Sequence, residues 1–203
     1  IKKVKKVLEA KGAVIIDVEF NISSDYKAAK EFYVLLYEFN VGMKNYLKGR
    51  DLPYETLEDI VAFNEANADT VLKHFGQEIF LESLKATDTE RYLKEREDIG
   101  RLAKAQIDSV LEANNLDVII GLTRNPGWLT DLENGDSRGD GGISWANGGL
   151  SAVAGYPHIT IPLGFVNDLP VGVSFLGTAW DEANLINAAY SFEQENKFFP
   201  IPK

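Results

Sequence analysis

The sequence contains no cysteine and only two histidines among its 203 residues. Without cysteine the chain cannot form a disulfide, and it lacks both a thiolate nucleophile and the sulfur ligands of structural zinc sites. His74 and His158 lie far apart, and neither accompanies the Gly-x-Ser-x-Gly elbow of a serine hydrolase. We therefore expect no metal, no cofactor and no serine–histidine triad in this sequence.

Long apolar runs and excess positive charge are also missing. The longest apolar runs are a few residues, whereas a membrane-spanning helix needs about 20, and the first residues lack the apolar stretch of a signal peptide. The formal net charge of −10 repels the phosphates of nucleic acids. We therefore expect a cytoplasmic protein with no membrane and no nucleic-acid partner.

The apolar residues that are present predict strands at four places. Short apolar runs at 13–18 and 116–121 are typical of strands buried on both faces. Runs at 158–163 and 171–176 flank a short polar connection and predict a hairpin. These elements predict an α/β fold with a partial mixed sheet, built from two buried strands and a C-terminal hairpin, and covered by helices.

Helical spacing of apolar residues fills most of the remaining sequence. Thr56 with Asp59 and Thr87 with Glu90 form capping-box patterns that open two of the helices. The predicted helices cover about 1–8, 24–49, 57–68, 77–84, 87–111, 150–154 and 181–192. The consecutive helices within 24–114 predict a helical insertion in one domain that spans residues 1–203.

Several motifs follow one another along the chain with a recognisable order and spacing. They are Asp-Val-Ile-Ile at 117–120, Pro-Gly-Trp-Leu-Thr-Asp at 126–131, and the segments 151–164 and 169–177, which contain Ala-Gly-Tyr-Pro and Leu-Pro-Val-Gly. Helical segments at 59–64 and 75–78 accompany them. Together they resemble the carboxyl-terminal part of the amidase signature family over essentially the whole chain. One departure is Gly-Leu-Thr at 121–123, where relatives commonly show Ala-Pro-Thr or Thr-Pro-Thr.

The resemblance implies an amidohydrolase with a nucleophilic serine, a second serine in a cis peptide, a lysine base and backbone amides as oxyanion hole. In that family these residues come from a Gly/Ser-rich segment of the amino-terminal half, and no Gly-Gly-Ser-Ser-Gly-Gly run occurs here. The resemblance therefore carries over no catalytic residue. Ser137 and Ser144 neighbour glycines, and we interpret both as loop residues.

The irregular stretch from Leu122 to Gly149 is the part of the sequence that we connect with substrate binding. Loops of this length are usually functional or disordered, and Trp128 and Trp145 favour an ordered loop beside a pocket. The resemblance implies that this half supplies part of the pocket wall. Trp128 is the first candidate, because open α/β sheets bind ligands just beyond strand ends, although a tryptophan that only fills the loop fits equally well. Thr123, Asn125 and Asp131 are the other candidates.

Three functional hypotheses follow. In the first, the parent protein is an amidase that converts a small carboxamide to an acid and ammonia or an amine, and this chain alone is inactive without the amino-terminal half of the same polypeptide. In the second, the chain is a stand-alone binding or scaffolding module derived from an amidase half. In the third, it belongs to a complex that amidates misacylated transfer RNA, which the acidic charge disfavours. A truncated fold would expose an apolar patch or form a homo-oligomer through it.

Overall fold

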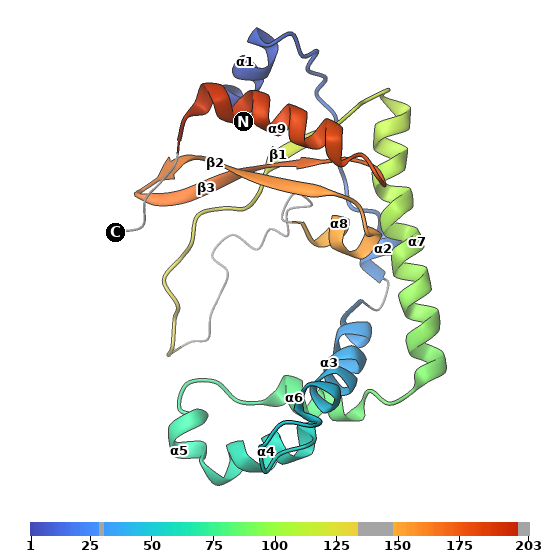
Figure 1. Cartoon of the computed structure of the whole chain (residues 1–203), viewed down its shortest axis with the longest axis vertical. Coiled ribbons are helices and arrows are strands. Elements are labelled where there is room, and N and C mark those ends of the chain that lie inside the picture. The colour runs from blue at the N-terminus through green and yellow to red at the C-terminus, as the bar shows by residue number, and fades with distance from the viewer. Residues whose placement is uncertain (29–30, 134–147, 199–203) are drawn as a thin grey trace. The chain divides into compact units, whose positions relative to one another are not determined.

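A computed structural model of the chain describes residues 1–28, 31–133 and 148–198 (Figure 1). The chain forms two compact units, one of residues 1–27 and 100–203 and the other of residues 28–99. The second unit lies within the predicted helical insertion at 24–114, whose bounds remain a prediction. Within the described residues no helix has the length and apolar character needed to cross a membrane.

The first unit contains a three-stranded sheet. Its strands are β1 (Ile119–Leu122), β2 (His158–Val166) and β3 (Leu169–Leu176), in the order β1-β3-β2. Both pairings are antiparallel, so the mixed pairing that we expected does not occur among the described strands. The predicted hairpin of β2 and β3 is confirmed, and the strands are longer than the sequence indicated.

The hairpin turns at Asn167 and Asp168, whose φ angles are 49° and 61°. Two successive residues in the left-handed region are characteristic of a type I′ turn, which matches the twist of the strands that it joins. Asparagine and aspartate tolerate this conformation better than other residues with a Cβ. The turn therefore follows directly from the local sequence.

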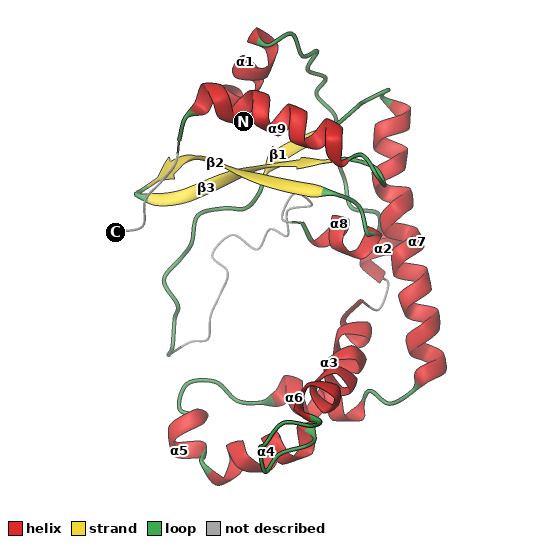
Figure 2. Ribbon diagram, viewed as in Figure 1, coloured by secondary structure: helices red, strands yellow, loops and turns green. Residues whose placement is uncertain are grey.

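Helices cover both faces of the sheet in this unit (Figure 2). The helices are α1 (Lys2–Ala10), α2 (Ser24–Ala28), α8 (Gly149–Ala154), α9 (Glu182–Asn196) and the part of α7 (Thr89–Ala113) from residue 100 on. Val173 and Phe175 of β3 pack with α1 and α9 in one core. Ile119 and Leu176 pack with α7 and α8 in a second core. The predicted mixture of sheet and covering helices is therefore confirmed.

The predicted strand at 13–18 is not a strand in the structure. The segment belongs to no helix or strand, and no ladder pairs it with any described strand. Its side chains are also not buried on both faces, since Val14 is 86% exposed and Ile16 is 48% exposed. The apolar composition favoured a buried strand, but a strand also needs a hydrogen-bonding neighbour, and the described chain supplies none beside this segment.

The second unit is helical. It contains α3 (Glu31–Leu47), α4 (Leu57–Ala66), α5 (Ala68–Val71), α6 (Glu78–Lys85) and the first turns of α7. The capping box of Thr56 and Asp59 is present. Hydrogen bonds with the backbone N–H of Glu55, with the Thr56 side chain and with the Thr56 backbone N–H lower the pKa of Asp59. These contacts confirm the helix start that the sequence predicted.

Two details of the helical prediction need comment. Within 24–49 the structure describes α2 and α3, on either side of residues 29–30, which lie outside the described residues; in α3 Val34 and Leu47 are buried, whereas the apolar Phe32 is exposed. The start of α7 is capped by Asp88, whose carboxylate accepts from the Arg91 backbone, and not by Thr87. The neighbouring elements determine which face of a helix is buried. When most faces of a helix carry apolar residues, their periodicity alone does not identify the buried face.

Candidate functional site

The chain leaves the sheet at Thr123, the residue that follows β1. Its backbone N–H donates to the Gly172 carbonyl at 3.0 Å, which extends the pairing of β1 with β3 by one residue. Its side-chain oxygen lies 2.8 Å from Oγ of Ser174, and Oγ1 of Thr160 lies 3.2 Å from that same atom. We call Thr123, Thr160 and Ser174 the hydroxyl cluster.

The hydroxyl cluster combines buried and accessible groups. Ser174 is completely buried, Thr123 is half-buried and Thr160 is exposed. Gly172 makes room for the two threonines, because a Cβ at this position would lie 2.8 Å from Cγ2 of Thr160 and 2.9 Å from Oγ1 of Thr123. Neutral hydroxyls both donate and accept hydrogen bonds, so this end of the sheet offers polar contacts without charge. The buried Ser174 cannot itself reach a substrate.

The loop after Thr123 carries the other three predicted site residues. Trp128 is 40% exposed, and the Arg124 guanidinium carbon lies 5.3 Å from the centre of its ring, a cation–π contact worth about 0.5–1 kcal/mol at an exposed site. Asn125 is exposed. Asp131 accepts a hydrogen bond of 3.0 Å from the Glu133 backbone, a local turn typical of aspartate.

The structure therefore brings only Thr123 into a cluster, while Asn125, Trp128 and Asp131 lie along the loop that follows it. Neither of two cavities found in the described residues is lined by any of these four side chains. Their role in substrate binding remains a prediction. Ser137, Ser144 and Trp145 lie outside the described residues.

The two histidines occupy separate environments. His74 lies exposed in a bend after α5, whereas His158 is the half-buried first residue of β2. A Cβ at Gly148 would lie 3.6 Å from the His158 ring. The part of the chain that the structure describes contains no group of three or more acidic or histidine side chains able to hold a metal ion.

Tyr156 and Asp108 form the most connected titratable pair near the sheet. The Tyr156 hydroxyl donates to Oδ2 of Asp108 at 2.8 Å, and Oγ1 of Thr178 donates to Oδ1 of the same carboxylate at 3.2 Å. Burial and this hydrogen bond to Asp108 raise the pKa of Tyr156. These bonds tie α7 to the segments that precede β2 and follow β3, so we assign the pair a structural role.

Thr160 and Ser174 were not predicted from the sequence, although a signal for them exists. If the strands paired without interruption outward from the turn, Ile161 would lie opposite Ser174 and Thr160 opposite Phe175. Because paired residues share one face of the sheet, that register would place apolar Ile161 beside polar Ser174 and polar Thr160 beside apolar Phe175. A register shift between Pro162 and Gly164 corrects it and pairs Thr160 with Ser174. The conflict between turn and hydrophobic pattern could therefore have indicated a bulge.

A profile of the protein family described as Amidase matches residues 1–186 of the chain. The chain belongs to the Amidase family. This confirms the resemblance that the motifs carry. The match includes the whole hydroxyl cluster and the Trp128 loop, so both are features of an amidase chain.

Individual relatives of this amidase chain are considerably longer. A probable amidase of Arabidopsis thaliana is 29% identical, with the match covering 98% of this chain and 36% of that protein. One subunit of the glutamyl-tRNA(Gln) amidotransferase of Exiguobacterium sibiricum is also 29% identical, over 100% of this chain and 42% of that protein. The crystal structure of the peptide amidase from Stenotrophomonas maltophilia matches with a TM-score of 0.84 and 34% identity, over 100% of this chain and 40% of that one. The chain thus spans less than half the length of these relatives.

Proposed function

We propose that this chain supplies sheet scaffold and part of the substrate pocket in an amidase that hydrolyses a carboxamide to a carboxylic acid and ammonia or an amine. The observation that carries the proposal is the match over the whole chain to the peptide amidase structure, at 34% identity. The Trp128 loop follows Thr123, the member of the hydroxyl cluster that lies just beyond the end of β1. Substrate contact at this end of the sheet is consistent with both features.

The chain by itself is inactive in this proposal. Amide hydrolysis needs a nucleophile with an adjacent base and donors for the oxyanion. The hydroxyl cluster offers neutral hydroxyls, and its only serine is buried. The nucleophile, its base and the oxyanion donors are contributed by the part of the polypeptide that corresponds to the rest of its longer relatives.

A peptide amide is the substrate class that we propose first. The partly exposed ring of Trp128 presents an apolar surface of the kind that packs against a peptide side chain. Thr123, Asn125 and Asp131 supply uncharged and acidic groups for the polar atoms of a peptide backbone. A cytoplasmic location remains a prediction from the short apolar runs of the sequence.

A hybrid enzyme tests the proposal. This chain replaces the matching 40% of the Stenotrophomonas maltophilia peptide amidase, and ammonia release from an amidated peptide is measured for the hybrid and for the isolated chain. We expect activity only in the hybrid, and a loss of about ten-fold or more in kcat/KM for Trp128→Ala, equivalent to about 1.4 kcal/mol. Leu129→Ala, at a fully exposed neighbour, is the matched control. Hydrolysis by the isolated chain would contradict the proposal.

A second candidate function is a role within an amidotransferase complex that acts on transfer RNA. The relative from Exiguobacterium sibiricum, which matches the whole chain, favours it, whereas the net charge of −10 disfavours contact with a phosphate backbone. Fluorescence anisotropy with labelled transfer RNA at low salt distinguishes the two. Saturable binding would favour the second candidate.

A further inference from the structure

The end of α9 contacts β2 at the register shift of the hairpin. Asn196, the last residue of α9, donates from Nδ2 to the Pro162 carbonyl at 2.9 Å and to the Leu163 carbonyl at 3.5 Å. The described pairing passes from Pro162 to Gly164 and leaves Leu163 without an opposite residue on β3, which makes Leu163 the extra residue of a β-bulge. The two carbonyls that Asn196 contacts therefore belong to the bulge.

These two contacts depend on the bulge. In a regular strand successive carbonyls point to opposite sides, because each residue is turned by half a revolution relative to the one before. One donor group cannot then reach two carbonyls in succession. Nδ2 of Asn196 reaches the oxygens of both Pro162 and Leu163, so its contacts fit a bulge at Leu163 and not a regular ladder there.

The carboxamide of Asn196 has one orientation that suits this place. Its NH2 group carries two hydrogens, which match two neighbouring carbonyl oxygens, whereas the amide oxygen would repel them. The amide oxygen, Oδ1, is buried and has no hydrogen-bond partner among the described residues. A buried acceptor without a partner is unfavourable, so the contribution of this side chain lies in the contacts of its NH2 group.

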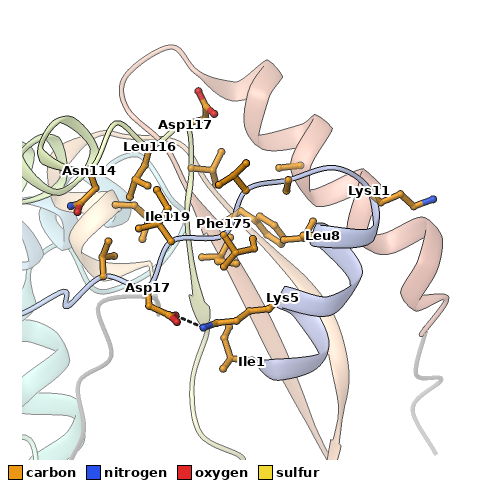
Figure 3. A pocket seen from close by; sticks show the side chains of 18 of the residues that line it. Ile1, Lys5, Leu8, Lys11, Asp17, Asn114, Leu116, Asp117, Ile119 and Phe175 are labelled. Carbon is orange, nitrogen blue, oxygen red and sulfur yellow. Dashed lines mark hydrogen bonds and ion pairs between the residues drawn. The ribbon is translucent and has the colours of Figure 1, made fainter.

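Asn196 belongs to a helix that is anchored in the core. Phe192, one turn earlier in α9, is completely buried and packs in one cluster with Phe175 of β3 and Leu8 of α1. Figure 3 shows Phe175 and Leu8 in the space between α1 and the sheet. The carboxamide of Asn196 therefore approaches β2 from a position that tertiary packing sets, independently of the hairpin sequence.

The hairpin sequence alone permits the bulge at more than one place. The apolar pattern pairs Ile161 with Val173, and the turn fixes the pairs beside it, so one extra residue is needed in between. A bulge with Phe165 as the extra residue would satisfy both ends equally. It would place Leu163 opposite Val171, which is an apolar pair of the kind that stabilises neighbouring strands.

Pro162 and Gly164, the residues that flank Leu163, do not settle the position either. Proline occurs at bulges and also along edge strands, and β2 lies at an edge of the described sheet. Gly164 is not in the left-handed conformation that a glycine bulge requires. A contact from outside the hairpin is therefore needed to decide where the bulge lies.

We propose that Asn196 is a positioning residue that fixes the bulge of β2 at Leu163. A bulge at Phe165 would return Pro162 and Leu163 to a regular ladder, in which Asn196 keeps at most one of its two acceptors. A bulge displaced the other way, beyond Thr160, would separate Thr160 from its partner in the hydroxyl cluster. This role of Asn196 does not depend on the substrate or the reaction of the enzyme.

Solution NMR of the isotope-labelled chain tests the proposal, because backbone nuclear Overhauser contacts show which residues lie opposite each other. The observed pairing gives a contact between Gly164 and Val171, and a bulge at Phe165 gives one between Leu163 and Val171. For Asn196→Ala we expect the ratio of the first form to the second to fall about ten-fold or more, because the bulge carbonyls lose their donor. Asn187→Ala, at an exposed asparagine of the same helix, is the matched control and should keep the observed pairing.

Asn196→Asp is a second variant, which preserves the shape of the side chain and replaces the NH2 group with an oxygen that cannot donate when ionised. We expect the same fall in the ratio for this variant. We expect no fall for Asn187→Asp, which introduces the same charge at the exposed site. The aspartate variant decides the question if the alanine variant does not fold.

Circular dichroism establishes which variants are folded before their strand pairing is compared. Folded Asn196 variants that retain the contact between Gly164 and Val171 would overturn the proposal, even at reduced stability, because the hairpin itself would then place the bulge. The same shift in the Asn187 variants would also overturn it. Loss of the contact between Thr160 and Ser174 in the Asn196 variants alone would support it, since the bulge would then have moved toward the hydroxyl cluster.

Discussion

The side-chain oxygens of Thr123 and Ser174 lie 2.8 Å apart, although 51 positions separate the two residues in sequence. The contact joins the loop that follows β1 to the buried face of β3. Because Ser174 also contacts Thr160 of β2, one buried hydroxyl of β3 contacts both β2 and the residue that follows β1. This hydroxyl therefore contacts the chain at the point where the predicted substrate loop leaves the sheet.

A double-mutant cycle measures this connection. Ser174→Ala and Thr123→Val each remove one hydroxyl, and we expect each to lower the free energy of unfolding by about 0.5–1.5 kcal/mol, the usual net value of a hydrogen bond. The double variant should lose less than the sum, with a coupling energy of at least about 0.5 kcal/mol. Urea unfolding followed by circular dichroism provides the measurement. Strict additivity would show that the two hydroxyls do not interact.

Gly172→Ala tests the space that the hydroxyl cluster needs. The new Cβ would meet Thr160 and Thr123 at less than 3.0 Å, so we expect a loss of about 1–3 kcal/mol in the free energy of unfolding from overpacking. Gly164→Ala, in β2, has no heavy atom within 4 Å of the added carbon and is the control. A similar loss in both variants would mean that general strand effects, and not the approach of the threonines, make glycine necessary.

Phe192 provides a test of the core beneath α9. Its side chain is completely buried beside Phe175, so Phe192→Ala should lower the free energy of unfolding by about 3–5 kcal/mol through lost burial and an unfilled cavity. Tyr190 lies on the same helix and is exposed, and Tyr190→Ala should change stability by about 0.5 kcal/mol or less. Thermal and urea unfolding of the two variants give the comparison. Comparable losses would contradict the assigned burial of α9.

Stability should also fall at alkaline pH because of Tyr156. Burial and the hydrogen bond to Asp108 raise the pKa of Tyr156 in the folded chain above the unfolded value. Its contribution to the free energy of unfolding is therefore complete below about pH 10, the ordinary tyrosine pKa. That contribution is lost as the pH rises through the folded pKa. Urea unfolding between pH 8 and 11, in about half-unit steps, should show a steeper decline for the unmodified chain than for Tyr156→Phe.

Tyr92 supplies the control for this pH series. A hydrogen bond to Glu38 raises the pKa of Tyr92, but both residues belong to the second unit. Tyr92→Phe should therefore leave the contribution of Tyr156 intact. If Tyr156→Phe follows the same pH profile as the unmodified chain, the contact with Asp108 does not contribute to stability at alkaline pH.

Several features of this protein were determined by the sequence itself, because they depend on neighbouring residues. Asn167 and Asp168 specify the hairpin turn, and Thr56 with Asp59 starts α4 through contacts within one helical turn. The order of the motifs indicated the amidase family without any knowledge of spatial contacts. Trp128, Asn125 and Asp131 were selected from the sequence, and nothing in the described structure decides their role.

Only the tertiary structure decided the features that depend on partners distant in sequence. The apolar pattern at 13–18 encodes a tendency to form a strand, but pairing depends on a neighbouring edge that the described chain does not provide. The hydroxyl cluster depends on the shift between Pro162 and Gly164, where the Asn196 side chain of α9 donates to the Pro162 carbonyl at 2.9 Å. A bulge can sit at several places along a hairpin with nearly the same local cost, so a contact from a remote helix is needed to select one.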